Sequence, residues 1–582
     1  MGLAPNSSKP FHLILSVFVA FLLPSCGDTT SDDQTDIARS GLRASDSPAA
    51  KALPPDAAPA EEQVFRYLGY EPAGLDISKS VYQSGQSEFI FERLCMLDHN
   101  NELIPAAADR WESSDDGKTW TFYLHPGAKW SDGTPVTAHD FEYTYRRLLD
   151  PDSGNVYAFF YYDIRGAKAY NQRETSDPGT LGIRALDDLT FVIETERPCS
   201  YLPFVTQFPT SSPVPRRQVE KYGEKWTEAG NFVSNSAFHL EEWLTGNHMT
   251  FGPNLYYDGN NPAYLRKIRR IFTGPVGSGS ASGPVGLLPY ENHEVDMVTV
   301  SGAADLERIR NDPVLSNELF SYDGFGTEYL FFRTQKPPFD DVRVRKAFAH
   351  ALDKETIANV VLGGSVLPAY TMLPPHFPGY VGDKYKDLQA YDPDRAQMLL
   401  AEAGYPGGRG FPNVDIWLAD SAPSSPIGQV SQVIQQKLRE VLGVTISIRN
   451  TQSNAYIKSM YEWEIPLSLG GFGYDYPDPQ SLLGVVWRSQ PKGYTRHDWT
   501  NTRFDEMIDR GVVELDPETR FGFYEEAERT IASDVGAAFL WHRLAHELRK
   551  PWVKGLKEDR WGNLPFRGNN TTYCDLYIGI RP

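Results

Sequence analysis

Residues Pro105 to Pro151 read PAAADRWESSDDGKTWTFYLHPGAKWSDGTPVTAHDFEYTYRRLLDP, and this stretch decides how the fold is interpreted. Apolar and polar residues alternate from Trp120 to Leu124, as they do on a strand with one buried face. The segment Ser131–Pro135 has the composition of a turn. A helical pattern follows from Asp140 to Leu149, and Thr137 stands in the position that caps such a helix. The stretch therefore predicts a strand, a turn and a capped helix in close succession.

The same two patterns recur along the rest of the chain. Strand-like runs rich in β-branched and aromatic residues occur at Val64–Leu68, Thr190–Glu194 and Val444–Ile448. Helix-like runs occur at Asp341–Leu352, Asp394–Ala403 and Ile427–Leu442. Gly443 follows the last of these helices and is expected to cap its C-terminus. Strands and helices that alternate in this way predict an α/β fold with more than one sheet.

Composition limits the classes of protein to which the chain can belong. It has 582 residues, a formal net charge of -20 and 41% hydrophobic residues. At roughly 100–200 residues per domain, this length predicts about three or four domains. An aromatic content of 13% is typical of a chain with a large packed core and not of a disordered one. No run of Lys and Arg suits a phosphate backbone, so we expect no nucleic-acid partner.

The sequence lacks motifs for catalysis or metal binding. His546-Glu547 has no second histidine at the spacing of a zinc site, and the run 274–286, interpreted as a flexible loop, lacks the Lys of a phosphate loop. None of the four cysteines, Cys26, Cys95, Cys199 and Cys574, belongs to a CxxC pair. We therefore expect no enzyme activity, no cofactor and no metal ion. The last three cysteines are expected to be small buried residues.

The N-terminus has the pattern of an export signal. Phe11 to Leu23 is mostly apolar but shorter than the roughly 20 residues that a membrane span needs. Pro24-Ser25-Cys26-Gly27 follows and resembles the lipobox of bacterial lipoproteins, in which the cysteine is acylated. The alternative is an ordinary cleaved signal followed by an unrelated cysteine. We predict a signal peptide over residues 1–25, lipidation at Cys26, and a disordered tether over residues 26–61.

The stretch 105–151 resembles the hallmark segment of the oligopeptide-binding proteins of ABC importers, which belong to family 5 of the extracellular solute-binding proteins. The similarity runs from Trp111-Glu112-Ser113 through Thr119–Phe122 to Ser131–Phe141. Further segments agree with the family in the same order, namely Ser212–Pro215, Glu294–Met297, Pro338–Arg345, Leu352–Lys354, Leu400–Tyr405 and Lys550–Val553. The resemblance therefore covers nearly all of the chain after the predicted tether.

This resemblance implies a two-lobe periplasmic-binding-protein fold of type II with an extra third domain. Domain I is then expected to combine residues 62–99, 206–325 and 545–582. Domain II takes residues 100–205, and domain III takes residues 326–544. The family's ligand cleft lies between domains I and III, and the lobes close over the ligand by a hinge motion.

The resemblance also implies a function. The chain is expected to be a monomeric, lipid-anchored binding protein in the periplasm or at the cell surface, with its lipid as the contact with the membrane. It would capture short peptides and deliver them to the permease and ATPase of an ABC importer. Receptors for a sugar, an opine or a metal complex remain open within the family. A secreted hydrolase and a purely structural lipoprotein remain open outside it.

The segment 470–479, GGFGYDYPDP, matches the place where the family holds the amine of the peptide. The resemblance gives Asp475 the role of pairing with that ammonium group, which is costly to bury without a carboxylate. Phe472 is expected to form the wall of a side-chain pocket, and Gly471 and Gly473 to offer backbone groups at close approach. The alternative is that Asp475 caps the turn that follows and Phe472 lies in the core.

Three further candidates come from their position in the family. Asn235 lies in a segment that lines the family's cleft, with a turn asparagine as the alternative, and Trp541 and His542 fall near a second cleft segment. Some relatives meet the peptide's carboxylate with basic residues, and the aligned positions here read Val360 or Leu362, Met460 and Leu469. Longer peptides, another partner for the carboxylate, or a ligand without one would each explain this departure.

Overall fold

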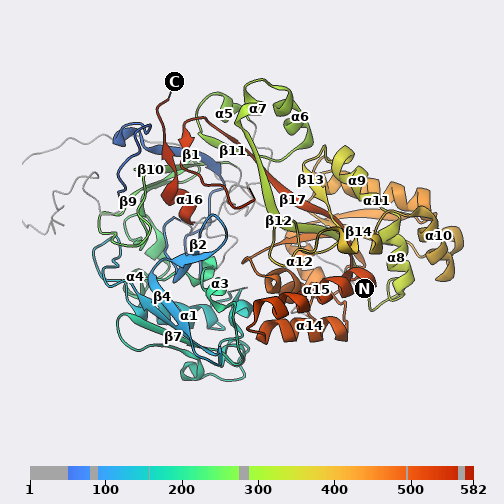
Figure 1. Cartoon of the computed structure of the whole chain (residues 1–582), viewed down its shortest axis with the longest axis horizontal. Coiled ribbons are helices and arrows are strands. Elements are labelled where there is room, and N and C mark those ends of the chain that lie inside the picture. The colour runs from blue at the N-terminus through green and yellow to red at the C-terminus, as the bar shows by residue number, and fades with distance from the viewer. Residues whose placement is uncertain are drawn as a thin grey trace, which may run out of the picture. The chain divides into compact units, whose positions relative to one another are not determined.

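The computed structural model describes residues 50–78, 89–155, 157–273, 287–492, 496–561 and 570–581. The predicted signal peptide, the lipidation site at Cys26, the first part of the tether and the loop at 274–286 lie outside these residues. Within them, the strands form one large sheet and three smaller ones (Figure 1). No helix in the described part of the chain combines the length and the hydropathy that a membrane crossing requires.

The large sheet is mixed and runs in the order β15-β14-β16-β12-β17-β11-β1-β10-β9-β8, with β13 paired to β17. Its strands are β1 (Val64–Gly69), β8 (Phe238–Leu244), β9 (His248–Pro253), β10 (Lys267–Phe272), β11 (Met297–Val300), β12 (Leu319–Phe332), β13 (Val366–Pro368), β14 (Val414–Ala419), β15 (Ile446–Thr451), β16 (Leu467–Gly473) and β17 (Ala537–Arg549). The long antiparallel strands β12 and β17 lie side by side at its centre and connect β14–β16 to β1 and β8–β11 (Figure 1).

The stretch that opened the sequence analysis folds as predicted. Strand β5 (Thr119–Leu124) lies in an antiparallel sheet with β4 (Ala108–Ser113), β7 (Thr190–Glu194) and β6 (Ile183–Ala185). Helix α1 (Ala138–Leu149) packs on β6 and β7. The backbone N–H of Thr137 donates to Asp140 Oδ2 at 2.9 Å, which fixes the start of the helix. Two smaller pairs join β2 (Cys95–Leu97) to β3 (Leu103–Pro105) and β18 (Val553–Lys554) to β19 (Tyr577–Ile578).

Caps predicted from the sequence lie at the start of α1 and at the end of α11 (Pro426–Leu442). The remaining helices are α2 (Ala167–Asn171), α3 (Leu202–Thr206), α4 (Arg216–Tyr222), α5 (Leu288–Glu291), α6 (Ala303–Asn311), α7 (Leu315–Glu318), α8 (Val342–His350), α9 (Lys354–Thr356), α10 (Pro393–Glu402), α11 (Pro426–Leu442), α12 (Ser453–Tyr461), α13 (Val485–Trp487), α14 (Thr502–Val513), α15 (Pro517–Asp534) and α16 (Asn570–Asp575). Helix α11 ends at Gly443, whose φ of 69° is left-handed and whose N–H donates to Arg439 O at 3.1 Å. The predicted C-cap is confirmed.

The predicted tether is wrong at its C-terminal end. Ala50 forms a β-bridge with Ala263, and Ala57 forms one with Gly579. Lys51 Nζ makes an ion pair with Asp575 Oδ1 at 2.9 Å. Residues 50–61 thus contact the folded body through backbone pairing, which needs no periodic apolar pattern and left no signal in the sequence.

The three cysteines of the described chain, Cys95, Cys199 and Cys574, are buried, as predicted, and all three are free thiols. Cys95 lies in β2, and Cys574 lies in α16, where its thiol donates to Asn261 O at 3.1 Å. Burial raises the pKa of the Cys574 thiol to about 12, so this thiol is protonated and unreactive at neutral pH.

Candidate functional site

The site predicted around Asp475 lies at the end of β16. This strand pairs antiparallel with β12, which places Gly471 opposite Glu328 and Gly473 opposite Gly326. The pairing continues one residue beyond the strand, because the N–H of Tyr474 donates to Phe325 O at 3.0 Å. The central strands of the large sheet therefore carry the chain directly to Asp475.

One carboxylate oxygen of Asp475 has no hydrogen-bond partner among the described residues. Its backbone N–H donates to Ser481 Oγ at 3.0 Å, which holds the main chain in place. Its Oδ2 is buried and has no hydrogen bond to any residue that the structure describes. Burial raises the pKa of Asp475 to about 7, and the positive charge of Arg496 partly opposes that rise. A buried acid in this state is suited to receive a cation.

Aromatic rings surround the segment that leads to Asp475. Phe472 is half-buried, and the guanidinium of Arg496 lies over its ring, 4.8 Å from the centroid. The ring of Tyr474 meets Phe325 edge-on at 5.4 Å and Phe377 at 5.8 Å between centroids. Phe472 is thus placed as one wall beside Asp475, and a positive charge covers one face of it.

Gly471 and Gly473 make room for an ion pair that the sequence analysis missed. Arg543, on β17, donates from Nε to Glu328 Oε1 at 2.8 Å and from Nη2 at 2.5 Å. A Cβ on Gly471 would lie 2.3 Å from Glu328 Oε2, and a Cβ on Gly473 would lie 3.1 Å from Arg543 Nη1. The protein's own atoms therefore require glycine at position 471. This requirement holds whether or not the backbone of Gly471 also contacts a ligand.

Two facts explain why this ion pair was missed. Glu328 and Arg543 are 215 residues apart, and only the pairing of β12 with β17 brings them together. The sequence signal was an acid and a base in largely apolar, aromatic strands, Tyr322–Phe332 and Ala537–Leu548, where a buried charge needs a partner. These strands also carry Asp323 and Glu547, so the sequence did not say which charges pair. Arg496 was missed as well, although its Nη1 donates to Gly471 O at 3.4 Å.

Trp541 and His542 lie on β17 beside the site, and both side chains are buried in the core. Trp541 is opposite Glu328 in the sheet and is buried. His542 is buried, and its Nδ1 shares a hydrogen bond of 2.8 Å with Thr327 Oγ1. Burial lowers the pKa of His542 to about 3, so the imidazole is neutral at physiological pH. It therefore cannot serve as a charged partner for a peptide carboxylate.

The side chain of Asn235 links its own segment to the backbone of Glu92. Its Oδ1 accepts the N–H of Glu92 at 2.9 Å, and its Nδ2 donates to Glu92 O at 2.8 Å. The side chain is buried, and in the described residues these bonds bind it to the backbone of Glu92. This arrangement gives Asn235 a role in the fold and provides no support for the predicted contact with a ligand.

Three of the four positions aligned with the family's basic residues are buried. Leu362, Met460 and Leu469 are buried in the core, and Val360 is exposed. Leu469 lies in β16 opposite Leu330. The charge at the far end of a cleft therefore cannot be inferred from these positions. Separately, Arg496 and Arg543 lie beside the segment of Asp475, and Arg543 is paired with Glu328.

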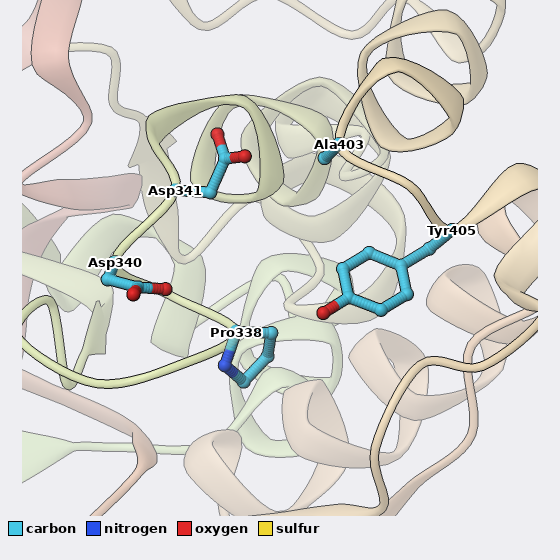
Figure 2. Close-up of a pocket in the computed structure, with 5 residues that line it drawn as sticks. All are labelled: Pro338, Asp340, Asp341, Ala403 and Tyr405. Carbon is cyan, nitrogen blue, oxygen red and sulfur yellow. The ribbon is translucent and has the colours of Figure 1, made fainter.

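A hollow in the described surface lies elsewhere. It has a volume of about 350 Å³ and is lined by Pro338, Asp340, Asp341, Ala403 and Tyr405. Figure 2 shows the Tyr405 hydroxyl directed toward Pro338 across this hollow. Asp341 is already engaged, because it accepts the N–H of Arg343 at 2.8 Å and caps α8. Asp340 is exposed, so neither acid of this hollow resembles Asp475, whose Oδ2 is buried without a hydrogen bond to the described residues.

No group of three or more His, Cys, Asp or Glu side chains in the described ranges has the arrangement of a metal site. A second hollow, of about 300 Å³, is lined by Lys51, Asp98, His99, Ile104, Asn260, Asn261, Lys557, Cys574 and Asp575. Both of its lysines contact Asp575, at 2.9 Å and 3.0 Å. Its charges therefore neutralise each other, and no ligand class is favoured.

Similarity to known proteins extends over most of the chain. Residues 102–494 match the family described as bacterial extracellular solute-binding proteins, family 5 Middle. The periplasmic oligopeptide-binding protein OppA of Salmonella typhimurium is 31% identical over 527 residues, covering 89% of this chain and 93% of that protein. The Escherichia coli protein named "Probable deoxycholate-binding periplasmic protein YgiS" is 28% identical over 524 residues, covering 88% and 93%.

A solved structure agrees with the architecture. The murein tripeptide binding protein MppA of Escherichia coli superposes with a TM-score of 0.74 at 27% identity, covering 90% of this chain and 100% of that one. The predicted α/β fold, a two-lobe fold of type II, is thereby confirmed. The boundaries of domains I to III stay a prediction.

Proposed function

The chain belongs to the bacterial extracellular solute-binding proteins of family 5, and from this premise we propose that it binds the free amine of short peptides at Asp475. The single observation that carries the proposal is the buried Oδ2 of Asp475, which has no hydrogen bond to the described residues. An ammonium group placed there would regain the charge partner that it loses on leaving water.

The relatives support an amine-bearing peptide over other ligands. Two of the proteins compared above are named for oligopeptides and for a murein tripeptide. Deoxycholate, for which a third relative is named, carries a carboxylate. A second anion beside Asp475 would be repelled, so the acid argues against a ligand of that kind here. Enzyme activity is not part of the proposal, because these relatives are named as binding proteins.

Charged residues beside the segment of Asp475 favour one orientation of the bound peptide. Arg496 lies over Phe472, and Arg543 lies against Gly473. The peptide amine is held at Asp475, and acidic groups of the ligand face Arg496, because Arg543 is already paired with Glu328. Side-chain variety elsewhere is accommodated by water, which bridges polar groups at little cost.

The proposal includes delivery to a membrane. The chain is exported by the signal at residues 1–25, acylated at Cys26 and held in the periplasm or at the cell surface. Residues 26–49 form the tether, shorter than the sequence predicted. The loaded protein, a monomer, then reaches the permease of an ABC importer. The names of periplasmic relatives support this location. Strands β12 and β17 serve as the hinge between domains I and III, because they link the two halves of the sheet.

The test is a comparison of two proteins with two ligands. A library of tripeptides to hexapeptides is offered to the full chain, and the tightest member is used with and without an acetyl group on its amine. We expect the wild-type protein to prefer the free amine, and Asp475→Ala to lose roughly 2–5 kcal/mol of binding free energy and with it that preference. Glu518→Ala, which changes an exposed acid, is the matched control. Equal affinity of wild type and Asp475→Ala, both folded, would remove the acid from the site.

A further inference from the structure

The residue after Asp475 is stacked against a distant part of the chain. The ring of Tyr476 lies parallel to that of Tyr201, with 6.0 Å between centroids and 2° between planes. The ring of Phe160 meets Tyr476 edge-on, also at 6.0 Å. Tyr476 is only 2% exposed, so its ring is enclosed by residues that precede it by more than 270 positions. Both geometries are the attractive ones for aromatic pairs.

Both sides of the stack are held rigidly by their own neighbours. Tyr201 donates its hydroxyl to Asp163 Oδ2, and Arg197 Nε donates to Asp163 Oδ1 at 2.8 Å. On the other side, the N–H of Asp478 donates to Tyr476 O at 2.8 Å. Neither ring can therefore move without disturbing the hydrogen bonds around it.

Asp478 is in turn fixed by the body of the chain. Its carboxylate forms a two-bond ion pair with Arg520, at 2.7 and 2.8 Å, and both side chains are buried. Arg520 lies in α15 and also donates to Gly511 O at 3.0 Å. The turn that contains Tyr476 is thus anchored to α14 and α15, while Tyr201 is anchored beside α3.

Further contacts join the same two regions. Gln207 Nε2 donates to the carbonyl of Asp475 in a long hydrogen bond of 3.5 Å. Leu515, between α14 and α15, lies 3.2 Å from where a Cβ on Gly117 would stand, in a place also bordered by Pro198. The backbone of Asp475 itself is therefore part of the contact between residues 117–208 and residues 475–520.

Tyr476 directly follows Asp475 in the chain, so the stacking of its ring affects the orientation of the acid as well as the packing of the core. Asp475 and Tyr476 share one peptide unit, so a shift of the ring away from Tyr201 must reorient the acid. The carbonyl of Asp475 would lose its bond from Gln207 in the same movement. The contact between the two regions and the orientation of the acid are coupled through two consecutive residues.

We propose that Tyr476 is a positioning residue, whose stack on Tyr201 holds the Asp475 carboxylate toward the ligand and locks the two regions together once ligand is bound. The inference rests on the proposed binding of an amine at Asp475. The ring makes the contact, so phenylalanine serves in its place. Removing either ring releases the lock and speeds dissociation of the ligand.

The experiment measures association and dissociation rates of the tightest free-amine peptide from the library, by stopped flow, with the full chain. We expect Tyr476→Ala and Tyr201→Ala each to raise the dissociation rate about tenfold or more, with little change in association. The double variant is expected to lose no more than either single one, because the two rings act as a pair. Tyr476→Phe should match wild type, and Tyr391→Ala, at an exposed tyrosine, is the control.

The outcomes separate this inference from the proposed function. If Asp475→Ala loses binding while Tyr476→Ala and Tyr201→Ala dissociate like wild type, the positioning role is overturned and the binding site stands. Additive losses in the double variant overturn it as well. If no library peptide binds wild type, the proposed function fails, and hydrogen exchange in residues 475–478 then tests the stack: unchanged exchange in Tyr201→Ala overturns it, and faster exchange supports it. Should Tyr476→Ala not fold, Tyr201→Ala and Tyr476→Phe carry the test.

Discussion

Asp475 combines an ionisable side chain with a buried oxygen that no described residue satisfies. Protein interiors rarely leave a polar atom in this state unless a ligand or water completes it. Glu92, another buried acid whose pKa burial raises to about 7, shows the contrast, because Tyr257 and Asn261 both donate to its Oε1. The difference between these two acids is what marks Asp475 as a site.

Peptide binding is expected to weaken as the pH falls below neutrality. Burial raises the pKa of free Asp475 to about 7, so the acid is largely protonated at pH 6. An ammonium partner favours the ionised form, so binding must then release a proton, and affinity falls by about tenfold per pH unit well below pH 7. Calorimetry at pH 5.5, 6.5 and 7.5, below the roughly 8 at which a peptide amine titrates, measures this slope. Asp475→Asn should show no such slope, and a flat wild-type profile would contradict the assignment.

The same acid is expected to reduce the stability of the empty protein at high pH. Its folded pKa, about 7, lies above the ordinary value of 3.8, so the fold loses stability as the pH rises from near 4 through 7. Asp475→Asn removes that loss and should stabilise the protein at pH 8 by roughly 1–3 kcal/mol, discounted because the residue is only half-buried. Urea unfolding at pH 8 and pH 4 measures it. Equal differences between the two proteins at both pH values would show that ionisation is not the cause.

Residue by residue, the resemblance points to the part of the candidate site that lies in one short segment, and its role in binding stays a prediction. Asp475 and Phe472 stand next to each other at the end of β16, and a local motif was enough to point to them. Arg543 and Glu328 were invisible, because an ion pair between strands far apart in sequence is created by sheet register. The role of Asn235 stays a prediction: its side chain bonds to the backbone of Glu92, and a backbone partner leaves no mark in the sequence.

At the scale of elements, glycines decide how closely β16 approaches β12. A Cβ on Gly471 would lie 2.6 Å from Thr327 O, a backbone atom that cannot turn away. The neighbouring Gly470 differs, because the nearest atom to its Cβ would be Tyr456 Oη at 3.7 Å. The two glycines therefore form a matched pair within one strand, one of them sterically required and the other not.

Gly471→Ala is expected to destabilise the protein by roughly 1–3 kcal/mol, because the strand or Glu328 must shift to admit the methyl group. Gly470→Ala should stay within about 0.5–1 kcal/mol of wild type, since its methyl group meets only ordinary contacts. Urea unfolding of both variants measures the difference. Equal effects would show that the pairing of β12 with β16 tolerates a wider separation than the structure indicates.

Elements with local signals were predictable, and those defined by their neighbours were not. Helices α1, α8, α10 and α11 carry caps and periodic patterns, and each appears within about two residues of its predicted bounds. Strands β12 and β17 were not predicted, although they form the centre of the sheet. Both are buried over most of their length, and β12 has irregular register against β17, so neither shows a regular alternation.

At the scale of the whole molecule, the N-terminal segment and the C-terminus are held together. The N–H of Ala58 donates to Ile578 O at 2.8 Å. Gln63 is fully buried and donates from Nε2 to Ala58 O at 2.8 Å and to Ile578 O at 2.7 Å. With the ion pair of Lys51 and Asp575, these bonds make residues 50–58 part of the fold, so the predicted tether extends no further than residue 49.

Two truncations are expected to differ because of this arrangement. We expect the deletion of residues 27–49, the part of the predicted tether that lies outside the described residues, to leave the unfolding midpoint unchanged. Deleting residues 27–58 removes the ion pair of Lys51 and leaves buried Gln63 without one of its acceptors, which should cost roughly 1–3 kcal/mol. Thermal unfolding of both truncated proteins beside the full chain measures the effect, and peptide affinity serves as the control because Asp475 lies elsewhere. A lower midpoint in the shorter deletion would mean that the tether itself packs on the body. Equal midpoints in all three proteins would show that residues 50–58 do not stabilise the fold.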